Sequence, residues 1–128
     1  MKFLAGLLTF LVALLHLGFM ALEMFFWNAP LGHKIFGMTA EVAAVSEVLA
    51  FNQGLYNGIL AVGLLWGLMA KKLDIKVFFL LAIMAAGVVG GFTAKMSILY
   101  IQALPALIAL LLILKTKGRR AGEPRLFS

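Results

Sequence analysis

Four long apolar segments constrain this chain more than any other feature. They cover about residues 3–27, 51–70, 77–94 and 98–114. A membrane-spanning helix needs roughly 20 predominantly apolar residues, and each segment is close to that length. Hydrophobic residues make up 64% of the 128 residues and charged residues only 12%, outside the usual range of a soluble domain. The sequence therefore predicts an all-α fold, an integral membrane four-helix bundle with no separate soluble domain.

The connection between the first two apolar segments predicts a short helix at the membrane surface. Pro30 ends the first helix, because the residue before a proline is disfavoured in the α conformation. Thr39 has the hydroxyl of a good N-cap, and Glu41 suits the positive end of a helix. We expect residues 40–50 to form this interfacial helix, continuous or nearly so with the helix over 51–70.

Charged residues mark the two later connections. Residues 71–76 are expected to form the second one, and Lys95 a tight third one. Pro105 lies inside the last apolar segment and has no N–H to donate, so it is expected to kink that helix and free the carbonyl of Ile101.

The basic residues predict the orientation, because cytoplasmic segments of membrane proteins carry an excess of Lys and Arg. Both termini are predicted to be cytoplasmic, in a bacterial inner membrane, with residues 1–114 as the membrane domain and 115–128 as a basic tail. Only Lys34 and Lys95 of the 11 basic residues then lie outside. The others are Lys2, Lys71, Lys72, Lys76, Lys115, Lys117, Arg119, Arg120 and Arg125.

Topology therefore accounts for the net charge of +6, and we expect no nucleic-acid partner. A single-stranded nucleic acid would need a basic groove interleaved with aromatic side chains, which the sequence lacks. It also lacks cysteine, and its histidines and acidic residues form no short-spaced pair, so no metal site is predicted. No cofactor is indicated, and enzymatic activity is left open.

Thr9, His16 and Glu23 are the strongly polar residues inside the first apolar segment. They are seven residues apart, so on a helix they form one stripe, and the cost of polar groups in lipid turns this stripe toward the other helices. Glu23 and His16 are candidates for proton transfer. The alternative for His16 is a structural hydrogen bond between helices.

A second polar group opens the next segment. Asn52, Gln53, Tyr56 and Asn57 place four hydrogen-bonding side chains in six positions, at the start of a run that must lie in lipid. Hydrogen bonds between helices would be the plain explanation, but each contributes only about 0.6 kcal/mol on average in membranes. We interpret the group as a ligand-binding site.

Lys95 and Gln102 fall at the same membrane depth as Glu23 and this group. The predicted site is one polar pocket, open to the non-cytoplasmic side, with Gln102 on its far wall. Glu23 and Lys95 can offset one another as an ion pair. That pair either sets the chemistry of the pocket or simply joins two helices.

Three motifs resemble a known bacterial membrane-protein family. They are Leu22-Glu23-Met24-Phe25-Phe26-Trp27, Asn52-Gln53-Gly54-Leu55-Tyr56-Asn57-Gly58 and Gln102-Ala103-Leu104-Pro105-Ala106. Together they are similar to the family catalogued as domain of unknown function 1304. The resemblance covers all four apolar segments and implies a four-helix inner-membrane protein, without an activity.

Three functions are compatible with these residues. The first is binding of a lipophilic or amphipathic small molecule in the polar pocket, with proton transfer by Glu23 and His16. The second is a proton-coupled exporter resembling the small multidrug transporters, with Glu23 as the coupling residue. The third is a structural protein or homo-oligomer that docks through the glycines of the second segment, which have small-x-x-x-small spacing; these are Gly54, Gly58, Gly63 and Gly67. Membrane lipid is a partner in all three.

Overall fold

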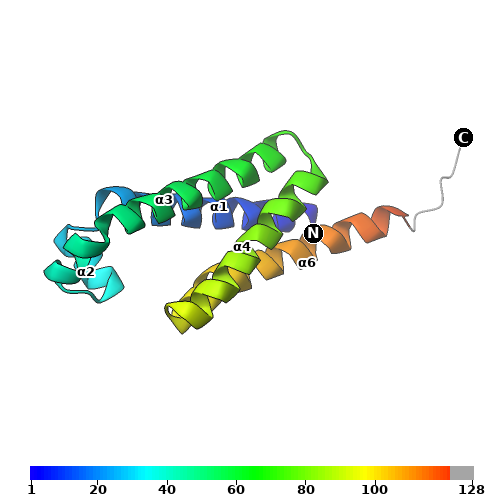
Figure 1. Ribbon diagram of the computed structural model, residues 1–128. Helices are drawn as coiled ribbons and strands as arrows, with labels where there is room; N and C mark the ends of the chain where they lie inside the picture. The colour runs from blue at the N-terminus through cyan, green and yellow to red at the C-terminus, as the bar shows by residue number, and fades with distance from the viewer. Residues whose placement is uncertain (122–128) are drawn as a thin grey trace, which may run out of the picture.

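The computed structural model describes residues 1–121 and shows two helical hairpins that meet at one end and diverge toward the other (Figure 1). In the first hairpin α1 packs against α3, and in the second α4 packs against the continuous helical stretch α5–η1–α6. This confirms the predicted all-α four-helix architecture. The elements are α1 (Lys2–Phe25), α2 (Pro30–Phe36), α3 (Ala40–Met69), α4 (Leu73–Thr93), α5 (Met96–Ile98), η1 (Leu99–Ala103) and α6 (Leu104–Ala121).

Four helical stretches are long and apolar enough to cross a membrane, as predicted. The longest is α3 with 30 residues, or about 45 Å at 1.5 Å per residue. The hydrocarbon core of a bilayer is only about 30 Å thick, so α3 extends past it. The chain is a membrane protein. The spans are Lys2–Phe25, Ala40–Met69, Leu73–Thr93 and Met96–Lys117.

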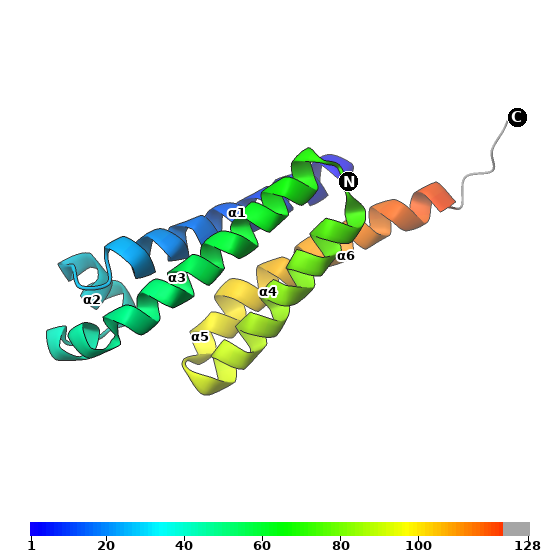
Figure 2. The same ribbon diagram turned by 45° about the horizontal axis from the view of Figure 1, so that its top comes forward.

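The hydrophobic core lies where the two hairpins meet. Val12 of α1, Leu64 of α3 and Ile83 of α4 are each at most 1% exposed, and Ala106 and Ala109 of α6 join them. From the turn at residues 70–72 the hairpins separate toward α2 and α5 (Figure 2). The bundle is therefore closed at the end that holds the N-terminus and open at the other.

Glycines let neighbouring helices approach closely, both within the first hairpin and between the two hairpins. A Cβ atom on Gly54 would lie 2.5 Å from Cγ of Met24 on α1, and one on Gly63 would overlap the ring of Phe79 on α4. Glycines on α3 are therefore already used for contacts inside the chain. A homo-oligomer through this face stays a prediction, and these contacts do not favour it.

The connection between α1 and α3 contains a short helix, α2, before the residues where a helix was predicted. Pro30 begins this helix at its first position, where the missing N–H costs nothing. Gly37 ends it with a left-handed φ of 64°, a conformation that favours glycine. Gly32 packs on the end of α1, where a Cβ would lie 2.7 Å from the carbonyl oxygen of Trp27. Residues 40–50, expected as the interfacial helix, are the first turns of α3.

The start of α4 and the end of α6 differ from the predicted positions by one helical turn or more. α4 begins at Leu73 rather than in the predicted position near Val77, and α6 continues to Ala121. The first seven residues of the predicted tail are thus helical, Arg125 lies outside the described residues, and the division into membrane domain and cytoplasmic tail stays a prediction.

A π-helical segment, η1, lies just before Pro105, where the sequence predicted a kink. In η1 the N–H of Leu104 donates to the carbonyl of Leu99, five residues earlier. This wider turn carries one extra residue. It packs against α4, where a Cβ on Gly87 would lie 2.7 Å from the backbone nitrogen of Ala103.

Candidate functional site

The structure joins the two predicted polar groups at one point, between Glu23 of α1 and Asn57 of α3. Nδ2 of Asn57 donates a hydrogen bond to Oε2 of Glu23 over 2.7 Å. Asn57 is 8% exposed and Glu23 is half-buried. A charge-assisted hydrogen bond of this length is strong, and lipid offers no water to replace it. This pair is the centre of the candidate site.

Asn57 belongs to the face of α3 that looks into the bundle. Gln53, Tyr56, Leu60 and Leu64 share this face, since they follow the i, i+3, i+7, i+11 spacing of one helical side. Leu64 is fully buried, Asn57 nearly so, Tyr56 is 57% exposed and Gln53 is exposed. The face is therefore covered at the closed end of the bundle and uncovered toward the open end. The hydrogen-bonded pair lies where this cover ends.

His16 lies deeper on the same stripe of α1 as Glu23. It is 1% exposed, and its Nδ1 is 2.9 Å from the carbonyl oxygen of Val12. Because a carbonyl oxygen can only accept, Nδ1 carries the proton, and Nε2 is left buried without a partner among the described residues. The ring meets Phe19 edge to face, with centroids 5.6 Å apart. The predicted stripe is thus turned inward, with separate partners for its two candidate residues.

The other predicted site residues do not join this centre. Lys95 is exposed between α4 and α5, at the far end of the second hairpin (Figure 2), and the partner of the Glu23 carboxylate is Asn57 instead. Gln102 is half-buried on η1, where its Cβ packs against Gly87. Asn52 is exposed on the outer face of α3, the side opposite Asn57.

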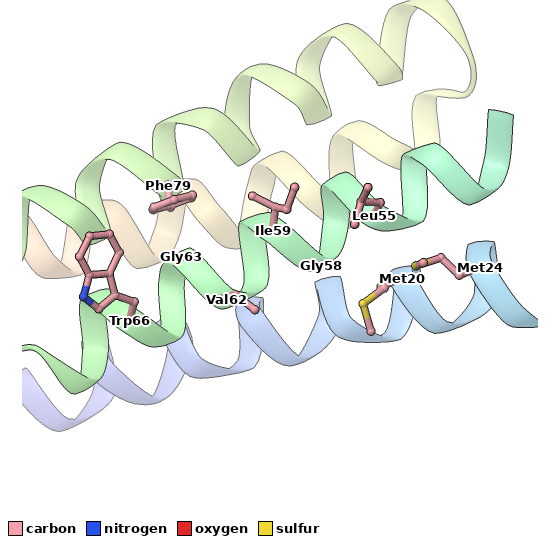
Figure 3. Close-up of a pocket in the computed structure, with 9 residues that line it drawn as sticks. All are labelled: Met20, Met24, Leu55, Gly58, Ile59, Val62, Gly63, Trp66 and Phe79. Atoms are coloured by element: carbon pink, nitrogen blue, oxygen red, sulfur yellow. The ribbon is translucent and has the colours of Figure 1, made fainter. Parts of the chain in front are cut away.

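An apolar groove of about 450 Å³ runs along that outer face of α3 (Figure 3). α3 provides most of its lining, with two methionines of α1 on one side and one aromatic ring of α4 on the other. Gly58 and Gly63 leave the space that other side chains would fill. The groove therefore offers no charged or amide group, unlike the predicted polar pocket. Its lining is Met20, Met24, Leu55, Gly58, Ile59, Val62, Gly63, Trp66 and Phe79.

A contact that the sequence did not indicate holds the open end of the first hairpin together. Nε1 of Trp27 donates to Oγ of Ser46 over 3.0 Å, and the Trp27 ring lies 4.7 Å from that of Phe36 on α2. The half-buried Trp27 ring therefore joins α2 to the first turns of α3 at this end of the hairpin.

Comparison with known proteins places the chain in a family. Residues 10–114 match the sequence profile described as "Protein of unknown function (DUF1304)". The chain is also 31% identical over 115 residues to the uncharacterized protein YpaA of Lactococcus lactis subsp. lactis (strain IL1403), covering 87% of this chain and 97% of that one. No solved structure matches. The chain is thus a member of the DUF1304 family of membrane proteins.

Proposed function

We propose that this protein binds a lipophilic or amphipathic small molecule on the uncovered part of the inner face of α3. The observation that carries the proposal is the hydrogen bond between Glu23 and Asn57 in an otherwise apolar span. A carboxylate inside a membrane segment is costly and marks a functional position by default. The adjacent uncovered face offers space for a ligand beside it.

The surroundings of the pair suit an amphipathic molecule. Its polar end would meet Glu23 and Asn57, with Tyr56 next to Asn57 in the chain and Gln53 one turn farther out. Its apolar part would extend along side chains that face lipid. The outer groove offers no comparable polar contact, so it does not explain why a carboxylate is kept in α1.

The proposal includes the orientation predicted from charge. The N-terminus, the turn at residues 70–72 and the last turns of α6 share one end of the bundle (Figure 1), and most basic residues belong to these segments. With that end in the cytoplasm of a bacterial inner membrane, the ligand enters from the opposite side.

Proton transfer is a second part of the proposal. His16 and Glu23 are seven residues apart on α1, or about 10 Å along its axis, and each has its own hydrogen-bond partner. The distance between them is therefore too long for direct proton transfer. An intervening water or a ligand group would have to carry the proton.

Small molecules that co-purify with the protein test the binding function. The full-length chain would be extracted from its membrane without detergent, and the released compounds compared by mass spectrometry among the native protein and its variants. We expect one compound to be retained by the native protein and lost in Glu23→Gln. Glu47→Gln is the matched control, because Glu47 is an exposed glutamate on α3, ten residues before Asn57. Identical bulk lipid in all samples would overturn the proposal.

A further inference from the structure

The hydrogen-bonding inventory of the Glu23 and Asn57 pair identifies the kind of head group that it can bind. Asn57 uses one of the two N–H groups of Nδ2 on Oε2 of Glu23, and its second N–H has no partner among the side chains described, residues 1–117. The same holds for Oδ1 of Asn57 and Oε1 of Glu23. Neither oxygen atom is enclosed, because the buried side-chain atoms without a partner in the described chain are Nε2 of His16 and of His33. Both open oxygen atoms are acceptors.

The charge at this position points the same way. An ionised Glu23 carries a negative charge, and in the described chain its hydrogen-bond partner is a neutral amide. Lys95, the basic residue predicted at this depth, is exposed at the end of the other hairpin. A carboxylate in an apolar span lowers its cost either by binding a proton or by meeting a positive partner. A cationic ligand group is a partner that would favour the ionised form.

We infer that the ligand of this site is a cationic amphiphile, a molecule with an ammonium-type head group and an apolar tail. The inference rests on the proposed binding function and narrows its ligand class. An ammonium group supplies hydrogen-bond donors and no acceptor, which complements Oε1 of Glu23 and Oδ1 of Asn57. A carboxylate or phosphate head group would add negative charge and acceptors to a site that already has both.

Three twelve-carbon amphiphiles with one tail and different head groups test the inference. Dodecylamine, dodecanol and dodecanoate would be titrated against the full-length protein in detergent micelles, and saturable binding measured by native mass spectrometry. We expect dodecylamine to bind at least about tenfold more tightly than dodecanol, as a charge-assisted hydrogen bond requires, and dodecanoate most weakly. Glu23→Gln should remove the preference for the amine over the alcohol, measured on the same variant, whereas Glu47→Gln should leave the binding of all three unchanged.

The outcomes separate the inference from the function on which it rests. Equal affinity for the amine and the alcohol in the native protein would overturn the cationic ligand class and leave the binding function standing. Tighter binding of dodecanoate would also overturn it. An absence of saturable binding for all three amphiphiles would overturn both. Circular dichroism shows whether Glu23→Gln is folded, and the comparison of head groups on the native protein does not depend on any variant.

Discussion

The coupling energy between Glu23 and Asn57 is the most direct test of the candidate site. We consider Glu23→Leu, Asn57→Leu and the double variant, which replace both polar side chains by apolar ones of similar size. The 2.7 Å contact joins a carboxylate to an amide donor. Hydrogen bonds to charged groups contribute about 1.5–3 kcal/mol, whereas neutral ones between membrane helices average about 0.6 kcal/mol. We predict a coupling of at least about 1.5 kcal/mol.

Reversible unfolding in mixed micelles, followed by circular dichroism, would measure the free energy of unfolding of all four proteins. The coupling is the amount by which the two single effects fail to add. A second cycle with Glu47→Leu and Asn57→Leu is the control, because these residues are ten positions apart on α3, about 15 Å along its axis, and should be additive. A coupling below about 0.3 kcal/mol for Glu23 and Asn57 would refute the hydrogen bond as the centre of the site.

Two further predictions concern the open end of the first hairpin. Gly32→Ala should destabilise the protein by about 1–3 kcal/mol, as overpacking does, because its Cβ would meet backbone carbonyl oxygens at the end of α1. Gly18→Ala is the control, because a Cβ at Gly18 would have no neighbour within 4 Å. Equal unfolding curves for the two variants would contradict the packing of α2. Trp27→Phe should cost about 0.5–1.5 kcal/mol through the lost bond to Ser46 and raise hydrogen exchange over residues 30–36. An unchanged exchange rate there would show that the indole does not hold α2.

Hydrophobic length and charge were enough to predict the four spans, because lipid leaves the backbone of such segments little choice but a helix. The ends of the helices were harder to predict. Asp74 was assigned to a turn because it is charged, but an acidic residue in the first turn stabilises a helix start. Pro30 was interpreted as a stop for α1, whereas it also starts α2.

Only part of the candidate site could be predicted, because the sequence indicates helix faces but not which helices meet. The seven-residue spacing of His16 and Glu23 depends only on helix geometry, and the structure turns both inward. Choosing Asn57 among four neighbouring polar residues required knowing which side of α3 meets α1, and this depends on the glycine contacts between the two helices. Lys95 shares the depth of Glu23 but lies on a hairpin that separates from α1, and depth alone contains no information about lateral distance.

The π-helical turn at Leu99–Ala103 has a consequence for how the length of this chain can vary. A π-helical turn is a single-residue insertion that the helix has absorbed without breaking. Because the wider turn takes up this residue locally, removing it would restore regular α-helical spacing and leave the residues on either side facing as they do now. Leu99 would then keep its contact with Gly91. Homologous chains of this fold that lack one residue here should therefore keep a small residue at the position of Gly91.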